Sequence, residues 1–285
     1  MTSIATDAPG RLGVLRGELR KIPAFARRDL LVAWSYRMSF FSDIIGLVGQ
    51  VLVFAFVGQM IDSDSLPRYG GTQVSYLEFA AVGIAISVFL QLGLDRVSVA
   101  IRGEQLMGTL EPVLATPTST STVQLGAVAF DLIYVPLRTA VFLTAVTLAF
   151  GLDLDASGLL PAMAILLVFI PLVWGLGVAS AAAVMTFRRG SGLIGTGVIG
   201  LGLISGIFFP ITLLPDWAQS LAAINPVATA IDGMREALLG GEGWAAAGSA
   251  IAHVAPWSIA VLGLGLFAFR VAVRRERRRG TLGLY

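Results

Sequence analysis

The sequence predicts an all-α integral membrane protein with six transmembrane helices. Hydrophobic residues make up 56% of the chain and charged residues only 13%, whereas an ordinary soluble domain is about 25% charged. The mean hydropathy is +0.82. Apolar residues gather in six stretches, each reaching the roughly 20 residues that cross a hydrocarbon core. These predicted spans are 39–61, 76–95, 123–150, 159–187, 192–214 and 250–271.

The chain before the first span divides into a polar tail and a predicted interfacial helix. Residues 1–21 are polar, and the first 37 residues contain no apolar run typical of a cleavable signal. Residues 22–37 place an apolar stripe opposite Arg27 and Arg28, interrupted by Asp29. The alternative is a solvated basic arm attracted by anionic lipid. We therefore divide the chain into residues 1–37, a membrane domain at 38–271 and a basic tail at 272–285.

The positions of the basic residues predict the orientation. Of the 20 lysine and arginine residues, all but three fall in the N-terminal tail, the second and fourth loops and the C-terminal end. Arg68 and Arg235 lie on the other side, and Arg138 lies within the third span. Short loops rich in lysine and arginine stay in the cytoplasm. We expect a multi-pass protein of the bacterial plasma (inner) membrane with both termini in the cytoplasm.

A polar stretch at residues 102–117 joins the second and third spans. Gly108 interrupts the incoming helix, Thr109 can cap a new helix, and Glu111 then lies in its first turn, where the helix dipole favours an anion. Pro117 limits this helix to about residue 115. The sequence predicts a short helix lying crosswise at the cytoplasmic surface and anchored at both ends to spans. Such an element suits the transmission of force from a cytoplasmic partner.

The same stretch carries a family pattern, R-x-E-x-x-x-G-T-L-E-x-x-L-x-T-P. Its residues are Arg102, Glu104, Gly108, Thr109, Leu110, Glu111, Leu114, Thr116 and Pro117. This pattern resembles the signature of ABC-2 type transporter permeases and is most similar to the branch of daunorubicin/doxorubicin-resistance permeases and nodulation exporters. A second patch at residues 206–217, with Asn225, Pro226 and Arg235, resembles the fifth span and outer segment of that family. Six spans in the expected order extend the resemblance over nearly the whole chain.

The segment between the fifth and sixth spans predicts two short amphipathic helices. Residues 217–224 form one apolar face, Asn225 and Pro226 break it, and residues 227–238 form a second. These helices could float at the outer interface with Trp217 as an anchor. The resemblance implies instead that they re-enter the outer leaflet and close the exit. The implied outer gate comprises Phe208, Phe209, Pro210, Pro215, Trp217, Pro226 and Arg235.

The fifth span contains Gly195, Gly197 and Gly200 in the order G-x-G-x-x-G. We reject a dinucleotide site because no strand precedes the motif and the segment is apolar and of membrane length. Small residues at four-residue spacing instead favour close helix packing. The packing partner is either a neighbouring helix of the same chain or a second copy.

Two charges lie inside the third span. Asp131 and Arg138 are seven residues apart, so they share a helix face about 10 Å apart along the axis, with Tyr134 between them. An ionised residue at membrane depth requires a partner or a water-filled cavity. One reading is a buried pairing, in which Asp131 reaches Arg138 through Tyr134 or either residue meets Asp43 or Glu78 on another helix. The other is that this face lines the translocation route and contacts a polar or anionic part of the cargo.

The residue inventory predicts no enzyme, catalytic residue or metal site in this chain. The chain has no cysteine and one histidine, which argues against thiolate and histidine-based metal centres. Its only lysine, Lys21, follows no glycine-rich loop, so the chain lacks a Walker A motif. We expect no bound cofactor here, with ATP and Mg²⁺ held by a partner ATPase.

The sequence therefore favours the permease subunit of an ATP-binding-cassette exporter for an amphipathic drug, lipid or glycolipid. The resemblance implies that residues 102–117 and the N-terminal helix contact a cytoplasmic ATPase. Two permease chains, identical or related, would form the membrane part, surrounded by lipid and without nucleic acid. The alternative is an intramembrane lipid-modifying enzyme or a scaffold using Asp131, Asp43 or Glu78. An enzyme would need such polar residues clustered at one depth, and the sequence does not identify the cargo.

Overall fold

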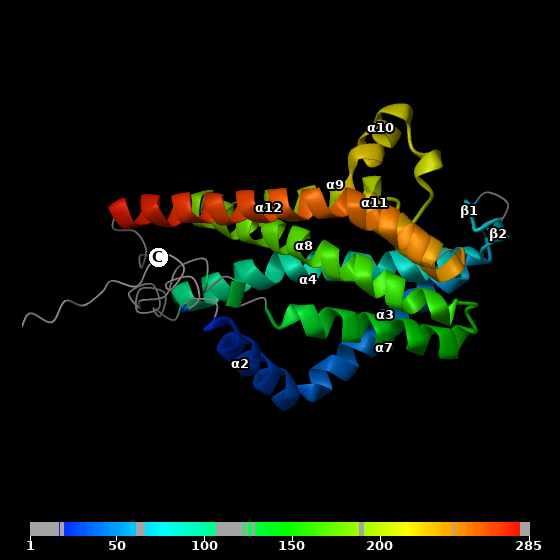
Figure 1. Ribbon diagram of the computed structural model, residues 1–285. Coiled ribbons are helices and arrows are strands. Elements are labelled where there is room, and N and C mark those ends of the chain that lie inside the picture. The colour runs from blue at the N-terminus through cyan, green and yellow to red at the C-terminus, as the bar shows by residue number, and fades with distance from the viewer. Residues whose placement is uncertain are drawn as a thin grey trace, which may run out of the picture.

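The computed structural model is a bundle of long helices with short elements gathered at one end (Figure 1). It describes residues 20–60, 66–106, 129–187, 191–241 and 243–279, together with residues 17, 122, 125 and 126. The bundle helices are α3 (Arg37–Gly58), α4 (Tyr76–Leu106), α7 (Asp131–Phe150), α8 (Leu159–Phe187) and α12 (Gly243–Arg279). We call the end at which α4, α8 and α12 begin the hairpin end, because the strands β1 (Arg68–Tyr69) and β2 (Thr72–Gln73) lie there.

Helix α8 is the centre of the bundle. In an 18-residue apolar window within Ala156–Thr186, 56% of the residues are buried, against 17% in such a window of α3 and 22% in one of α12. Large apolar side chains of α3, α7 and α12 face outward, including Phe56, Ile133 and Phe267. This pattern is typical of a membrane bundle, in which lipid solvates the outer apolar faces. At its periphery the bundle therefore exposes apolar side chains that a soluble protein would bury.

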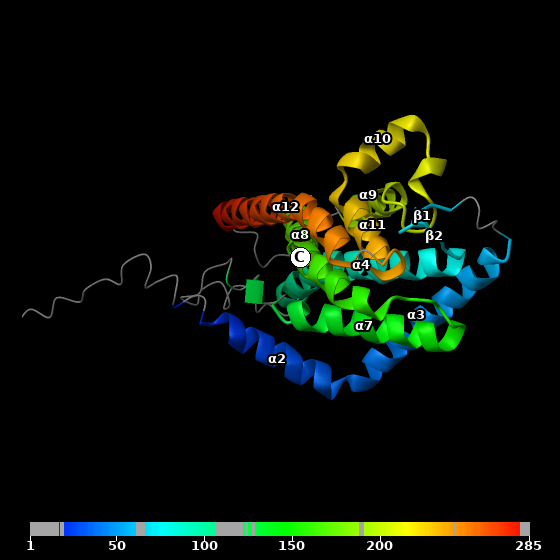
Figure 2. The ribbon, with the colours of Figure 1, turned by 45° about the vertical axis from the view of Figure 1, so that its right-hand side comes forward.

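Helices α8 and α12 pack side by side over most of their length (Figures 1 and 2). A methyl group on Gly175 of α8 would lie 2.5 Å from the backbone nitrogen of Leu262 on α12, so only glycine permits this approach. The Ser258 hydroxyl donates a hydrogen bond to the Val168 carbonyl oxygen at 2.7 Å. Small residues and a hydroxyl at the crossing bring the backbones close, as in other membrane helix pairs.

Four helices of the described chain are long and apolar enough to cross a membrane: Phe41–Gly58, Asp131–Phe150, Ala156–Thr186 and Gly243–Glu276. The predicted second span begins α4, but the apolar part of that helix is the shorter Tyr76–Gln91. The last span is longer than predicted, because α12 continues through the start of the predicted basic tail to Arg279. Of the predicted third span, the described part is α7, from Asp131 onward.

The prediction of one continuous span at 192–214 is wrong. Helix α9 runs from Ser191 to Ile204 and then stops. Gly206 has a φ of +69°, in the left-handed region that favours glycine, and Pro210 precedes the 3-10 turn η3 (Ile211–Leu213). The methyl positions of Gly197 and Gly200 meet no atom within 4 Å. Within the described residues, these two glycine positions therefore have no close neighbour.

Helix α2 (Ile22–Ser35) occupies most of the predicted interfacial helix. None of its residues is buried, and Trp34 is 73% exposed. The chain turns at Tyr36, so α2 diverges from the bundle before α3 begins (Figure 2). Asp29, which interrupts the apolar stripe, pairs with Arg28 at 2.9 Å.

Two short helices follow η3 at the hairpin end, α10 (Asp216–Ile224) and α11 (Pro226–Leu239). Asn225 separates them, as its sequence context predicts. Its side-chain oxygen accepts a hydrogen bond from the Val227 backbone nitrogen at 3.0 Å, which caps α11. Its amide nitrogen donates to the Ser205 hydroxyl at 2.7 Å, tying the cap to the end of α9. Helix α11 packs into the bundle, whereas α10 projects from it (Figure 1).

Candidate functional site

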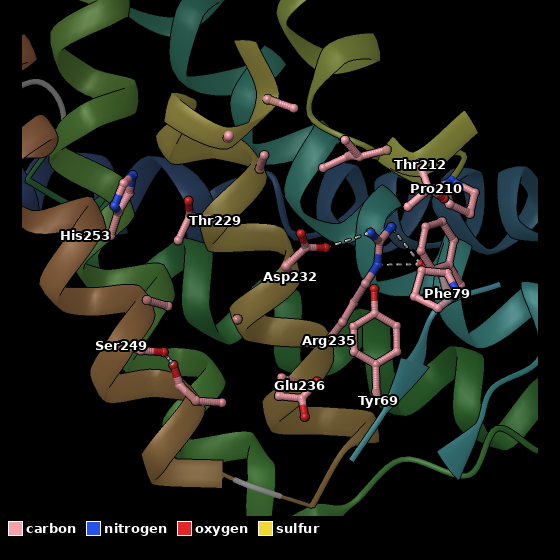
Figure 3. Close-up of a pocket in the computed structure, with 18 of the residues that line it drawn as sticks. Tyr69, Phe79, Pro210, Thr212, Thr229, Asp232, Arg235, Glu236, Ser249 and His253 are labelled. Atoms are coloured by element: carbon pink, nitrogen blue, oxygen red, sulfur yellow. Dashed lines mark hydrogen bonds and ion pairs between the residues drawn. The ribbon is translucent and has the colours of Figure 1, made fainter. Parts of the chain in front are cut away.

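A buried arginine organises the hairpin end (Figure 3). Arg235 of α11 is 1% exposed. Its Nε and Nη2 donate to the Phe79 carbonyl oxygen at 3.2 and 3.1 Å. Nη1 donates to the Gly206 carbonyl at 2.9 Å, and Nη2 to the Ile207 carbonyl at 3.0 Å. The Asp232 carboxylate accepts from Nη1 at 3.5 Å. All five N–H groups of the guanidinium thus have acceptors.

The chain around Arg235 is shaped to bring these carbonyls together. The left-handed turn at Gly206 ends α9 and directs two successive backbone carbonyls at the guanidinium. A methyl group on Gly83 would overlap the Ile207 carbonyl oxygen and lie 2.8 Å from Nη2 of Arg235. Glycine at position 83 therefore permits α4 to approach the broken end of α9. The arginine hydrogen-bonds to backbone carbonyls that the break leaves outside a helix.

An aromatic cluster surrounds the same point. The guanidinium carbon of Arg235 lies 3.5 Å from the centroid of the Phe79 ring, a cation–π contact. Tyr76 donates its hydroxyl hydrogen to the Phe208 carbonyl at 2.9 Å. The Phe208 ring stacks on Phe54 of α3, with the centroids 5.2 Å apart and the planes at 3°. The broken end of α9 is therefore fixed to α3, α4 and α11 together, and we call this assembly the Arg235 knot.

The hairpin and two loops close the knot from outside the spans. The Gly70 backbone nitrogen donates to the Glu236 carboxylate at 3.0 Å. The Glu78 carboxylate accepts from the Asp153 backbone nitrogen at 3.1 Å, and the Leu238 carbonyl accepts from Asp155 at 2.8 Å. Burial raises the pKa of Tyr69 to about 12, against the lowering effect of the Arg235 charge. Tyr69 therefore stays a neutral phenol throughout the physiological range.

A cavity of about 880 Å³ opens beside Arg235. Thr229, Asp232, Gly233 and Glu236, which share one face of α11, form its floor. Ala246, Ser249, Ala250 and His253 of α12 form one wall, and η3 and α10 form the other. Asp232 lies on the floor with 49% of its side-chain surface exposed. Surrounding protein nevertheless excludes much of the bulk water, so desolvation raises the pKa of this carboxyl while Arg235 opposes the shift.

The structure brings together part of the predicted outer gate. Arg235 and Phe208 meet in the knot, and Pro210 lines the cavity. Pro226 starts α11, and Pro215 directly precedes α10. Trp217 is 65% exposed and Phe209 partly exposed. The gate set thus contains the buried Arg235, two prolines at helix starts, and two aromatic side chains that are at least partly exposed.

Sequence reasoning missed several residues of the knot. Gly83 and Phe79 lie in an apolar helix without any distinguishing signal. Tyr69 had one, since R-Y-G-G-T-Q places two glycines between β-compatible residues, a typical two-residue hairpin pattern. The pairs Arg68 with Gln73 and Tyr69 with Thr72 form that hairpin.

The two charges of α7 each have a partner on another helix. Asp131 is 2% exposed and accepts a hydrogen bond from Trp174 Nε1 of α8 at 3.3 Å. Arg138 is 8% exposed, and its Nη2 lies 3.5 Å from the Asp43 carboxylate of α3. Arg138 Nε has no hydrogen-bond partner among the described residues. A cavity of about 20 Å³ beside it, lined in part by Tyr134, is about the size of one water molecule.

The polar residues considered for an enzyme do not gather at one depth. Asp131 begins α7, whereas Glu78 meets Asp153 beyond the opposite end of that helix. The 20 residues of α7 separate the two ends by about 30 Å at 1.5 Å per residue. In the described residues, no group of three or more histidine, aspartate or glutamate side chains could hold a metal ion.

The predicted ATPase-coupling residues lie at and beyond the far end of α4. Arg102 and Glu104 belong to the last two turns of that helix. The other members lie outside the described residues: Gly108, Thr109, Leu110, Glu111, Leu114, Thr116 and Pro117.

Comparison with known proteins agrees with the resemblance noted in the sequence. No curated protein matches the chain. The family model for ABC-2 type transporters matches residues 20–239, which include α2, the bundle helices up to α8, the break after α9 and the Arg235 knot. The match covers well over half of the chain, and the apolar helices support a multi-pass membrane protein. The chain belongs to the ABC-2 type transporter family.

Proposed function

We propose that the chain is the membrane-spanning permease subunit of an ATP-binding-cassette exporter for an amphipathic drug, lipid or glycolipid. A separate cytoplasmic ATPase would hold ATP and Mg²⁺, and two permease chains would form the membrane part. Membership of the ABC-2 family is the observation that carries this proposal. The motif at residues 102–117 favours the branch of daunorubicin/doxorubicin-resistance permeases and nodulation exporters.

Helix α4 supports a mechanical link between the two ends of the molecule. It runs without interruption over 31 residues from Tyr76 to Leu106, about 46 Å at 1.5 Å per residue. Its first turns carry Phe79 and Gly83 of the Arg235 knot, and its last turns carry Arg102 and Glu104. In our proposal, a push on the coupling residues by the ATPase moves α4 as a rigid rod and disturbs the knot at the exit.

The orientation of this rod follows from the basic residues. With residues 102–117 in the cytoplasm, the hairpin end faces outward and α10 and α11 lie at the outer leaflet. Cysteine introduced at Asp155 should then react with a membrane-impermeant reagent added to intact cells, because this residue is partly exposed in the loop beyond α7. Cysteine at Ser119 should not react. The reverse labelling pattern would remove the coupling residues from any cytoplasmic ATPase.

Two roles are proposed for Arg138 and Asp131. In the first, their contacts with Asp43 and Trp174 lock α7 to α3 and α8. In the second, this face lines the translocation route. The half-exposed Asp43 carboxylate, with 44% of its side-chain surface accessible, supports access from outside the bundle. Arg138→Gln separates the two roles, because a structural role lowers the amount of folded protein and a pathway role changes transport at normal protein level.

The main test is reconstitution with the ATPase encoded by the adjacent gene. The two proteins should co-purify, and the pair should hydrolyse ATP faster in the presence of cargo. Glu111→Lys should abolish that stimulation while membrane insertion stays normal, since the charge opposite the ATPase groove is reversed. Glu242→Lys makes the same charge change on the predicted outer side and should retain stimulation. Failure to retain any ATPase, or full stimulation in Glu111→Lys, would overturn the assignment.

A further inference from the structure

We infer that the cavity beside Arg235 is a binding site for an amphipathic cation, with Asp232 as the anionic anchor. The inference goes beyond the proposed function and does not require that the ligand be transported. It rests on the size of the cavity, the composition of its lining and the two carboxylates on its floor, Asp232 and Glu236.

The cavity has the dimensions and the lining of a small-molecule site. Its volume is about 880 Å³, within the roughly 300–1,000 Å³ range of ligand pockets. Alanine residues of α10 and α12, among them Ala223 and Ala246, form apolar parts of the walls, and polar side chains of the same elements and of the floor lie between them. The alanine side chains leave room for an apolar body, and the polar groups of the floor and walls can orient a ligand.

The sign of the ligand charge follows from the hydrogen bonds of the floor. Arg235 donates four of its N–H groups to the carbonyls of Phe79, Gly206 and Ile207, and the fifth faces Asp232 at 3.5 Å, so an anionic ligand would have to displace that carboxylate. Its charge also faces three carbonyl dipoles and lies almost completely below the surface. An anion in the cavity would therefore meet a carboxylate rather than a free guanidinium.

Asp232 is the floor group with remaining capacity. Its contact with Arg235, at 3.5 Å, lies at the limit for a hydrogen bond. Its side chain is 49% exposed and lines the cavity. A carboxylate can accept about four hydrogen bonds. Glu236, one turn further along α11, has one oxygen engaged with the Gly70 backbone nitrogen. The two carboxylates outnumber the one buried arginine, which favours a cation.

The carboxylate of Asp232 and the alanine side chains of the walls fit one ligand geometry. A cationic head placed at Asp232 leaves the apolar part between α10 and α12, where Ala223, Ala246 and Ala250 supply contact surface. Figure 3 shows Asp232 on the same side of α11 as Thr229, with Ser249 and His253 on the neighbouring helix. Hydroxyl groups at both helices add acceptors for an ammonium head. An amine on an apolar cage or chain therefore matches this site, with the amine at Asp232 and the apolar part against the alanine residues.

The chain lacks cysteine, so an introduced cysteine is its single thiol. The reaction rates of that thiol with charged reagents can report the electrostatic preference of the cavity. Ser249→Cys places one thiol on the cavity wall. The purified protein in nanodiscs is treated with two methanethiosulfonate reagents of similar size, one trimethylammonium and one sulfonate. Ala252→Cys is the control, since this exposed residue of the same helix is not part of the cavity lining.

The cationic reagent should modify Ser249→Cys at least fivefold faster than the anionic reagent, relative to the ratio at Ala252→Cys. Asp232→Asn should remove most of that preference. 1-Aminoadamantane should slow the reaction at Ser249→Cys in a saturable manner, whereas adamantane-1-carboxylate, with the same cage and the opposite charge, should not. Equal rates for the two reagents, or equal protection by the two adamantanes, would overturn the site.

The inference stays testable if Asp232→Asn misfolds. If Asp232→Asn loses its monodisperse profile, Ser249→Cys with the intact carboxylate still tests the charge preference and the selective protection. Failure of these labelling results leaves the ATPase test untouched, because that test probes the opposite end of α4. Conversely, loss of ATPase co-purification would not change the labelling rates in the cavity.

Discussion

Removing the Arg235 side chain is the most demanding test of the knot. In Arg235→Ala, the carbonyls of Gly206 and Ile207 lose the donors that they have in the described part of the chain. Each buried unsatisfied carbonyl costs about 1–3 kcal/mol, and loss of the contact with the Phe79 ring costs about 1–2 kcal/mol more. Removing a buried charge also removes its desolvation cost. We therefore expect a net loss near the lower end, about 3 kcal/mol.

The assay is thermal unfolding of purified protein in detergent, followed by the monodisperse fraction that survives heating. In soluble domains of about 150–250 residues, each kcal/mol shifts the midpoint by roughly 2–4 °C. On this scaling, a loss of about 3 kcal/mol should lower the midpoint by roughly 6–12 °C. Arg235→Lys keeps the charge but replaces the planar fork by a compact ammonium, so its loss should be intermediate.

Arg68→Ala is the matched control for this measurement. Arg68 is the other arginine of the hairpin end, and its side chain is exposed and bonded to Gln73 at 3.2 Å. An exposed substitution of this kind should change stability by less than about 0.5 kcal/mol. Equal midpoints for Arg235→Ala and Arg68→Ala would refute the claim that the carbonyl contacts hold the end of α9.

Three further predictions address other parts of the molecule. Gly175→Ala should lower the yield of folded protein, since its methyl group would lie 2.5 Å from a backbone nitrogen of α12, whereas Gly263→Ala, with no atom within 4 Å, should fold normally. In a double-mutant cycle of Arg138→Gln and Asp43→Asn, the coupling energy should be about 1 kcal/mol, reduced from a fully buried value because Asp43 is partly exposed; additive effects would remove the ion pair as a helix lock. In alkaline titration, the tyrosinate absorbance that Tyr69→Phe removes should develop near pH 12, and a midpoint near 10 would show that the phenol is not buried.

The sequence alone determined the class of the protein and its family. Composition and the long apolar stretches identify a membrane protein because the signal is an average over many residues, which no single contact can overturn. The motif at residues 102–117 and the patch near Pro210 pointed to the family that the comparison then showed. The helix break at Asn225 was also readable, since a capping side chain followed by proline acts within one turn.

Only the tertiary structure decided what the polar residues contact. Arg235 reaches Phe79, 156 residues away in the chain, and nothing local to either residue encodes that pairing. Arg138 had several possible partners, and the packing of α3 against α7 selects Asp43. The early end of α9 has the same origin, because an apolar composition suits a long helix and the turn at Gly206 is stabilised by donors from α11. Helix propensity and hydropathy act over a few neighbouring residues, whereas the partner of a buried charge depends on which helices pack together.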